Sequence, residues 1–398
     1  MSLIKQLQLN SLLEVTEAIN NNTSENDLYR IFYFISISNL RFKHIAHLVQ
    51  EDGALVSKTS KDLEIDEILM EHLKILNFKE GIIDLSKRAK LKVLHDNIDY
   101  IIPITHKDRL LAYILVGLGK EEKHENEEFT FIQTLANIIM VAIENKRLVR
   151  KELQNVALQK ELEIASTVQN LLLPKTLPDN DWLRTHVTYV PNKIVGGDYY
   201  DFIELDNDQV IFCIADVSGK GMPSALLMSN FQAVLRTFLR QNADLKALVE
   251  ELNFQILSSS EGIHFVTFFV AKIDINTGKV EYINAGHNPP IFLSGKREKL
   301  LKEGTTILGA LDELPFVNVG HLQLKKGDLL YSYTDGVSEV MNYKDEEYGE
   351  EKVIQQILKA NKEGDLVKIH QRILTAIDEF RGERGFFDDL TMYSLFWK

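Results

Sequence analysis

Apolar residues in the first 145 positions follow the 3.6-residue period of helices in some segments and the two-residue period of strands in others. LNSLLEVTEAIN and NDLYRIFYFISI have helical spacing, and the polar residues Asn22, Thr23 and Ser24 can cap the second helix. Two hairpins are expected, HIAHLVQ with ALVSKT around Glu51-Asp52-Gly53 and DYIIPITH with RLLAYILVGLG around Lys107-Asp108. An amphipathic helix, DEILMEHLKIL, lies between them. This pattern predicts a small α/β domain over residues 1–145.

A long helix is expected to begin near Glu125, because neither proline nor glycine occurs between there and Leu173. Apolar positions repeat at heptad-like spacing in one frame, Leu135, Ile139, Ala142, Val149, Leu153 and Val156, with Lys146 interrupting. The spacing continues in a shifted frame at Leu158, Leu162, Ala165 and Leu172, with the polar Gln169 at one of its positions. A helix of about 45 residues would be roughly 70 Å long, more than a single domain buries. We therefore expect residues 146–174 to form a parallel two-stranded coiled coil in a homodimer. The alternative is two ordinary helices with a break near Lys151 or Gln159.

After Pro174 the pattern changes to many short strands, which are VTYVP, GDYYDFIEL, QVIFCIAD, HFVTFFVAKID, KVEYINAG, PPIFLS, PFVNVGHLQL, DLLYSYTD and TMYSLF. Helices are expected over 220–241, over 243–259 and in EEKVIQQILKAN and LVKIHQRILTAIDEF. VIFCIA is apolar on both faces, which is typical of a strand inside a sandwich. Residues 175–398 are therefore predicted to form one α+β domain.

Composition and charge exclude several classes of protein. The chain has 58 acidic and 45 basic residues, a net charge of −13, so it is a poor candidate for binding a nucleic-acid backbone. The lone Cys213 excludes disulfides within the chain and cysteine-rich metal sites. No apolar run approaches the roughly 18 residues of a membrane span, and MSLIKQLQLN lacks the apolar core of a signal peptide. A cytoplasmic protein that contacts neither membrane nor nucleic acid is expected.

Four aspartates lie beside small residues at strand ends in the C-terminal domain, in the strings Gly196-Gly197-Asp198, Ala215-Asp216-Val217-Ser218-Gly219, Tyr333-Thr334-Asp335-Gly336 and Asp388-Asp389-Leu390-Thr391. A carboxylate at such a place costs free energy unless it is paired or bound to a cation. Any one Asp-Gly pair could simply make a turn, but four in one domain favour a shared site. Converging carboxylates suit Mg²⁺ or Mn²⁺, and two such ions can activate water and hold a phosphoryl group.

The order of IVGGDYYDF, IADVSGKGMPSALL, NAGHNPP, YSYTDGVSE and FDDLTMYSLF resembles the PPM metal-dependent Ser/Thr protein phosphatases. It is most similar to their bacterial branch, the stage II sporulation and sigma-B regulator phosphatases, over roughly residues 160–398. The resemblance implies a PPM β-sandwich flanked by helices. It also implies hydrolysis of phosphoserine or phosphothreonine by metal-activated water, without a covalent enzyme intermediate.

By position in these motifs, the resemblance implies that Asp198 and Asp216 bind the bridging pair of Mn²⁺ or Mg²⁺ ions. The carbonyl of Val217 would be a further ligand, and Asp335 and Asp388 would complete the site. Asp389 is the alternative to Asp388. Lys193 stands where eukaryotic relatives have a phosphate-binding Arg, which makes it a weak candidate for that role.

Several other residues have expected roles outside metal binding. Ser218 replaces the histidine of the eukaryotic enzymes, so no general acid is evident. Asp201 is expected to make a structural hydrogen bond and His287 to stabilise a turn. Cys213 is expected in the core. Lys220 lacks the upstream glycine of a phosphate-binding P-loop, so ATP binding there is rejected.

Two other functions were weighed. The GGD string is shared with the GGDEF motif of diguanylate cyclases, but Tyr199-Tyr200 replaces Glu-Phe, and no acidic strand end lies about forty residues upstream. A catalytically weak sensory or scaffold regulator is the second alternative, against which stand all four predicted metal aspartates.

The order of elements in residues 1–145 resembles a GAF sensory domain, which implies a small-molecule or protein signal. Six histidines lie in this part and could include a metal or haem ligand, although scattered core or surface positions are expected: His44, His47, His72, His95, His106 and His124. STVQNLLLPKTLP is similar to the regulatory helix of the phosphatase family, and Gln169 is its predicted regulatory residue. The resemblance further implies a phosphorylated STAS-domain anti-sigma-factor antagonist as substrate, and thereby control of a sigma factor by partner switching.

Overall fold

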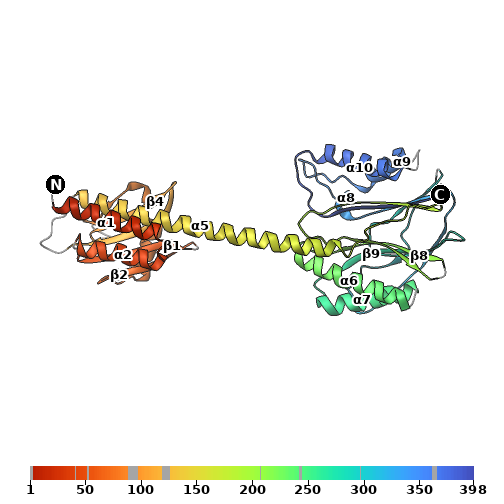
Figure 1. The fold of residues 1–398 in the computed structure, drawn as a ribbon, viewed down its shortest axis with the longest axis horizontal. Coiled ribbons are helices and arrows are strands. Elements are labelled where there is room, and N and C mark those ends of the chain that lie inside the picture. Colours follow the sequence, from red (N-terminus) through yellow and green to blue (C-terminus); the bar gives the residue numbers. More distant parts are fainter. Residues whose placement is uncertain are drawn as a thin grey trace. The chain divides into compact units, whose positions relative to one another are not determined.

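The computed structural model describes residues 3–40, 42–51, 53–87, 97–118, 126–206, 208–241, 244–295, 297–360 and 365–398. The predicted turn residue Asp52 and the histidines His95 and His124 lie outside these ranges. The chain divides into two compact units, Met1–Val156 and Ala157–Lys398, and the division falls inside the predicted linker 146–174 (Figure 1). Each unit is described by itself.

The N-terminal unit contains a five-stranded antiparallel sheet in the order β2-β1-β5-β4-β3. Its strands are β1 (His44–Glu51), β2 (Ala54–Lys61), β3 (Ile83–Asp84), β4 (Tyr100–His106) and β5 (Arg109–Gly117). The two predicted hairpins are present as β1–β2 and β4–β5. Lys107 and Asp108 turn the second hairpin with φ values of 47° and 60°.

Helices cover both faces of this sheet. They are α1 (Leu3–Asn20), α2 (Glu25–Ser38) and α3 (Glu67–Ile75), with short 3-10 turns η1 (Phe78–Glu80) and η2 (Leu85–Lys87). Ser24 caps α2 by accepting the N–H of Asp27, and Asp66 caps α3 in the same way. One core joins α2 and the start of α5 to one face of the sheet, and a second core joins α3 to the other face.

Helix α5 (Asn126–Asn170) runs unbroken for 45 residues, so the alternative of two helices with a break is wrong. Its first part packs in the N-terminal unit through Ile132, Leu135 and Ile139. Apolar side chains further along are exposed: Leu148, Val149, Leu153, Val156, Leu158, Ile164 and Val168. These residues have no covering partner within the described chain, which suits the coiled coil, and the dimer stays a prediction.

The C-terminal unit is built around two sheets. One has the order β13-β10-β9-β8-β7, with β14 also pairing with β10, and the other has the order β12-β11-β15-β16-β6. The strands of the first sheet are β7 (Tyr199–Leu205), β8 (Gln209–Val217), β9 (Val266–Asp274), β10 (Lys279–Ala285), β13 (Gly304–Thr305) and β14 (Gly320–Gln323). Those of the second are β6 (Leu183–Val190), β11 (Ile291–Ser294), β12 (Arg297–Leu300), β15 (Leu329–Tyr333) and β16 (Leu390–Trp397).

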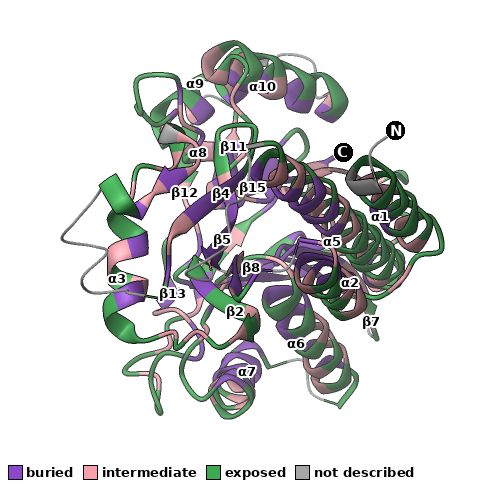
Figure 2. Cartoon of the chain, turned by 90° about the vertical axis from the view of Figure 1, so that its left-hand side faces the viewer, coloured by how far each residue is buried: buried purple, intermediate pink, exposed green. Residues whose placement is uncertain are grey.

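The helices of this unit are α6 (Met222–Gln241), α7 (Leu245–Ser260), α8 (Asp335–Ser338), α9 (Glu350–Ala360) and α10 (Leu366–Arg381). Figure 1 shows α6 and α7 on the outer side of one sheet and α9 and α10 on the outer side of the other. Between the sheets, the ring of Phe212 on β8 stacks on that of Tyr393 on β16 with centroids 4.2 Å apart. The strands are mostly buried and the outer helix faces exposed (Figure 2).

The predicted sandwich flanked by helices is therefore present as a mixed α+β fold. The strand predicted over PFVNVGHLQL is shorter in the structure, where only Gly320–Gln323 forms the strand β14, paired with β10. The prediction also missed β12 and β13, whose charged or glycine-containing sequences carry no alternating apolar pattern. In the part of the chain that the structure describes, no helix is long and apolar enough to cross a membrane.

Candidate active site

The four predicted aspartates come from both sheets of the sandwich. Asp198 immediately precedes β7 and Asp216 lies near the end of β8, both in one sheet. Asp335 follows β15 by two residues as the first residue of α8, and Asp388 lies two residues before β16, both in the other sheet. The site is thus assembled where the ends of the two sheets meet.

Asp198 is buried, with 2% of its surface exposed. Its carboxylate accepts a hydrogen bond from Thr334 Oγ1 at 2.9 Å and another from Thr391 Oγ1. Burial raises the pKa of Asp198 well above its usual value, and the nearby Asp216 adds to this effect. Sequence reasoning missed both threonines, although each lies in a string that was singled out for its aspartate.

The pKa values of Asp216 and Asp335 are raised as well. Burial, followed by the charges of Asp335 and Asp388, raises the pKa of Asp216 to about 8. Burial, followed by the charges of Glu339 and Asp388, raises the pKa of Asp335 to about 6. The side chains therefore lie close enough to repel one another, which is the arrangement expected where a cation is to be bound.

The donor chemistry of these residues fits a hard dication, with one qualification. Among the described residues, no three His, Cys, Asp or Glu side chains are grouped closely enough to chelate a single ion. Mg²⁺ commonly binds proteins through only one or two carboxylates and keeps several waters, so separated aspartates remain suitable ligands. Burial and, after it, like-charged neighbours disfavour the ionised forms of Asp198, Asp216 and Asp335, and a bound dication would favour them.

The adjacent Asp388 and Asp389 have different surroundings. Asp389 is buried, and its two carboxylate oxygens accept the backbone N–H groups of Asn192 and Gly197 at 2.8 and 2.7 Å. Asp388 is 37% exposed and faces Lys220, whose Nζ lies 2.8 Å from its Oδ2. Asp389 thus fixes the loop before β7 through these two hydrogen bonds. Asp388 is the more exposed of the two aspartates and forms the ion pair with Lys220.

Two glycines before Asp198 have no room for a side chain. A Cβ on Gly196 would lie 2.3 Å from Asp389 Oδ2, and one on Gly197 would lie 2.7 Å from the carbonyl oxygen of Val217. The carbonyl of Val217, predicted as a ligand, therefore lies directly against the glycine that precedes Asp198.

The end of α5 is joined to this loop by Gln169. Its Nε2 donates to the carbonyl oxygen of Gly196 at 2.7 Å, and its Oε1 accepts the N–H of the same residue at 3.2 Å. Gln169 is 8% exposed, so both bonds are shielded from water. The predicted regulatory residue thus contacts the backbone two residues from Asp198.

Loop 218–221 lies at the same edge. Ser218 Oγ accepts the N–H of Phe265, and its carbonyl oxygen lies 3.1 Å from His264 Nδ1, so Ser218 has a structural part. The exposed Lys193 reaches within 3.8 Å of the place where a Cβ of Gly221 would be. His264 is not among the residues that the sequence singled out, since no motif contains it.

Other residues singled out in the sequence lie apart from the carboxylates. Cys213 is buried in β8, and burial raises the pKa of its thiol well above the usual value. Asp201 accepts two hydrogen bonds from Arg236, both at 2.8 Å, in agreement with the expected structural role. His287 is buried with Nδ1 2.9 Å from Thr267 Oγ1, and its N–H donates to Asn284.

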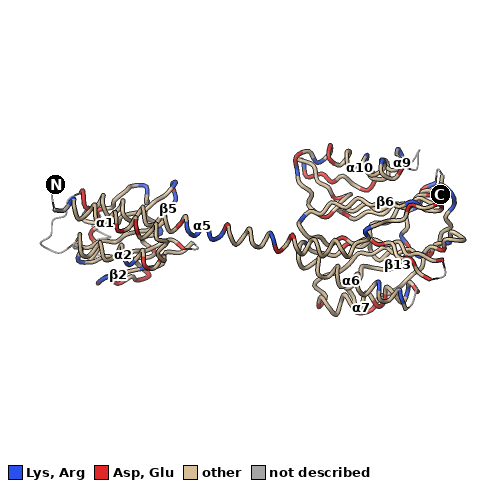
Figure 3. Tube along the Cα trace, viewed as in Figure 1, with Lys and Arg blue, Asp and Glu red and all other residues tan. Residues whose placement is uncertain are grey.

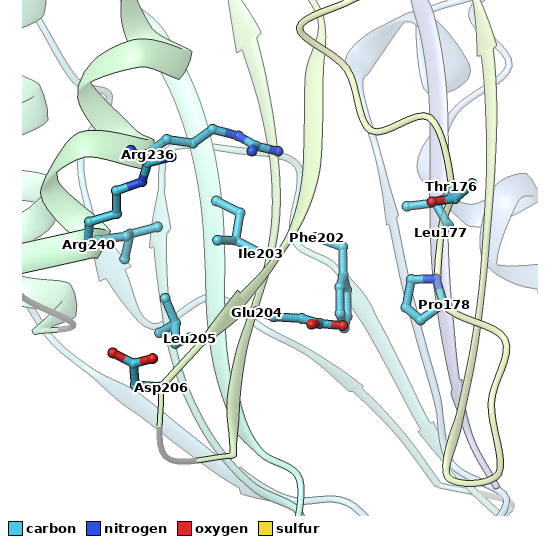
Figure 4. A pocket seen from close by; sticks show the side chains of 11 residues that line it. Thr176, Leu177, Pro178, Phe202, Ile203, Glu204, Leu205, Asp206, Arg236 and Arg240 are labelled. Atoms are coloured by element: carbon cyan, nitrogen blue, oxygen red, sulfur yellow. The ribbon is translucent and has the colours of Figure 1, made fainter.

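Arg236 also borders a pocket of about 550 Å³ at the far end of β7 (Figure 4). Phe202, Leu205 and Leu239 line it together with Pro178. Since Asp198 precedes the first residue of β7 and Leu205 is the last, this pocket lies a strand length from the carboxylates.

A small apolar cavity of about 20 Å³ lies between the sheet of the N-terminal unit and helices α2 and α5. His47 and Tyr29 line it, and neither His47 Nε2 nor Tyr29 Oη has a hydrogen-bond partner among the described residues. Burial lowers the pKa of His47 to about 3 and raises that of Tyr29 to about 12, so both are neutral at pH 7. Ala136, Ile139 and Met140 of α5 complete the wall.

Charged residues are interspersed over both units and along α5 (Figure 3).

Residues 206–398 match the family model of Stage II sporulation protein E (SpoIIE). The chain is 29% identical over 283 residues to Protein IcfG of Synechocystis sp., an alignment that covers 63% of this chain and 44% of that protein. It is 30% identical over 184 residues to Phosphoserine phosphatase RsbU of Bacillus subtilis, covering 46% and 54%. The chain spans about half the length of these curated relatives.

A solved structure agrees with this match. The SiaA-PP2C domain of Pseudomonas aeruginosa superimposes with a TM-score of 0.55 at 19% sequence identity, covering 62% of this chain and 99% of that domain. At this identity the likeness shows the fold. The C-terminal unit of the chain is therefore a PP2C-type (PPM) phosphatase domain of the SpoIIE family.

Proposed function

We propose that the whole chain is a signal-regulated, metal-dependent protein serine/threonine phosphatase. One observation carries the proposal: aspartates from both sheets lie at one end of the sandwich, where burial, and after it like-charged neighbours, raises the pKa of three of them. A site of this kind needs cations, and its phosphatase family supplies the reaction.

Asp198, Asp216 and the carbonyl of Val217 would hold two Mn²⁺ or Mg²⁺ ions on one side, with Asp335 and Asp388 on the other. When bound, such ions supply Lewis-acid chemistry, lowering the pKa of water and neutralising charge on a phosphoryl group. Thr334 and Thr391 fix the orientation of Asp198 through their hydroxyls. Lys193, whose Nζ would lie 3.8 Å from a Cβ on Gly221, is the first residue proposed to bind the phosphate.

The substrate proposed is a phosphoserine or phosphothreonine side chain of another protein. The name Phosphoserine phosphatase of the relative RsbU supports phosphoserine. By resemblance, the protein partner would be a STAS-domain anti-sigma-factor antagonist, whose dephosphorylation releases a sigma factor. The buried thiol of Cys213 is unsuited to nucleophilic attack, which favours direct hydrolysis.

Regulation is proposed to run from the GAF-like N-terminal unit along α5 to Gln169. The signal at this unit is proposed to be a small molecule or another protein, and it would have to act elsewhere than in the cavity beside Tyr29 and His47, whose 20 Å³ hold about one water molecule. Exposed apolar side chains further along α5 are proposed to pair with a second copy of the chain. A different helix register would then move Gln169 and, through Gly196, the loop before Asp198.

Hydrolysis should depend on metal and on the predicted ligands. Full-length protein with Mn²⁺ should hydrolyse a phosphoserine peptide, and EDTA should abolish this activity. Asp198→Asn should lower kcat at least about 100-fold, because the substitution removes a charge that must offset a bound dication. Asp312→Asn, an exposed aspartate of the same unit, is the control. Unchanged turnover in EDTA, or none with Mn²⁺, would contradict the phosphatase proposal in favour of a binding module.

The raised pKa of Asp216 predicts how the stability of the metal-free protein depends on pH. A carboxyl whose pKa is about 8 when folded and roughly 3.9 when unfolded stabilises the folded state only while it holds its proton. Between about pH 4 and 8, Asp216 should therefore lower the free energy of unfolding by up to about 1.4 kcal/mol per pH unit. Asp216→Asn should make this decline shallower.

Urea unfolding in EDTA at several pH values measures this effect. Tryptophan fluorescence reports on the C-terminal unit alone, because both tryptophans, Trp182 and Trp397, lie there. Equal slopes of stability against pH in the wild type and in Asp216→Asn would show that the carboxyl is not perturbed.

Gln169 should control turnover without being needed for folding. Gln169→Ala removes both hydrogen bonds to Gly196 and should change kcat at least about threefold, while KM for the peptide moves less. Gln159→Ala, an exposed position on the same helix, is the matched control. If both variants match the wild type in kcat, the proposed path from α5 to the site fails, and with it the proposed control by the N-terminal unit.

The exposed apolar positions of α5 should hold a dimer together. The double change Leu153→Lys and Val156→Lys places charge where the coiled coil would be dry and should convert dimer to monomer in sedimentation experiments at micromolar concentration. Glu152→Lys and Asn155→Lys, exposed neighbours on the same turns, should leave the dimer intact if they lie outside the seam. A wild type that is already monomeric would refute the dimer.

A further inference from the structure

Lys220 is presented by a loop whose backbone suits only glycine on either side. Gly219 and Gly221 have φ values of +95° and +86°, in the left-handed region that L-residues with side chains rarely adopt. This short turn directly precedes α6, which begins at Met222. The glycines of the string SGKG are therefore explained by the backbone: two positions with positive φ, which favour glycine, flank Lys220.

The ammonium group of Lys220 lies beside the aspartate cluster. Its Nζ is 2.8 Å from Asp388 Oδ2 and also donates to the carbonyl oxygen of Phe387. Its charge also lowers the pKa of Asp335, against the other influences there. Among the described residues, this is the one ion pair made by any of the four aspartates predicted as ligands.

The same side chain borders open space. Lys220, Gly336, Glu339 and Asp388 line a pocket of about 390 Å³, and the side chain of Lys220 is 44% exposed. A lysine on a flexible stem can turn its ammonium group from one partner to another within such a space. Lys220 can therefore reach either the carboxylates or a group that enters from the pocket.

The ion pair of Lys220 with Asp388 is expected to break when the carboxylates bind dications. Like charges a few ångströms apart repel, so the ammonium would lose its place at Asp388. The phosphate of a substrate is a strong partner for the freed ammonium, through a charge-assisted hydrogen bond.

We infer that Lys220 exchanges partners: it pairs with Asp388 in the metal-free site and binds the phosphate group of the substrate in the metal-loaded site. The inference rests on the proposed phosphatase function. It assigns a phosphate-binding role to a residue that the sequence had only excluded from a P-loop, and it adds a second lysine to the candidate Lys193.

Two titrations test the exchange, with Lys220→Met as the main variant because it keeps side-chain length and removes charge. Calorimetric titration of metal-free protein with Mn²⁺ should show affinity about two- to fivefold higher in Lys220→Met, because the competing cation is gone. Titration of the Mg²⁺-loaded protein with inorganic phosphate, followed by ³¹P NMR, should show affinity about tenfold lower. Lys220→Arg should keep phosphate affinity within about threefold of the wild type, since the charge remains.

Two controls separate the role of Lys220 from fold and from general charge. Lys246→Met, an exposed lysine on α7, should leave both affinities unchanged. Lys193→Met should weaken phosphate binding without tightening Mn²⁺ binding, since Lys193 makes no ion pair with the four aspartates. Tryptophan fluorescence melts check that each variant folds.

The expected pair of results in Lys220→Met supports the exchange. Unchanged Mn²⁺ affinity overturns it, and so does unchanged phosphate affinity. In the peptide assay, Lys220→Met should raise KM more than it lowers kcat. If the wild type fails to hydrolyse the peptide at all, the proposed function fails, while the two titrations still decide the inference about Lys220.

Discussion

Loss of hydration at carboxylates that also repel one another is the constraint on which the arrangement of the candidate site depends. Asp198, Asp216 and Asp335 lose hydration on folding and gain like-charged neighbours, and both changes disfavour their ionised forms. The fold offsets part of this cost locally, with two hydroxyls at Asp198 and one ammonium at Asp388. The remaining negative charge is what the proposed cations would offset.

The large features could be read from the sequence because they depend on local pattern. Alternating apolar residues gave the sandwich, and aspartates at strand ends gave the place of the site. The hydrogen-bond and ion-pair partners of these aspartates could not be predicted, because the two residues of each pair lie far apart in the chain. Thr391 and Asp198 are 193 residues apart, and Lys220 and Asp388 are brought together only when the two sheets pack.

Gly196 shows how tightly the contact made by Gln169 is linked to the candidate site. A side chain there would collide with Asp389 on one side and with the hydroxyl of Tyr189 on the other. The loop therefore has little freedom to absorb a displacement of Gln169. Such stiffness favours two discrete loop positions over a graded response, as is usual in well-packed interiors.

The position of Cys213 has a practical consequence. It is the single cysteine of the chain and is fully enclosed in β8, with a thiol that stays protonated at neutral pH. A thiol reagent added to the folded protein would find almost nothing to modify. Cysteines placed by mutagenesis on exposed turns of each unit would then be labelled selectively in the otherwise native background, so spin or fluorophore pairs could record distances across α5 as conditions change.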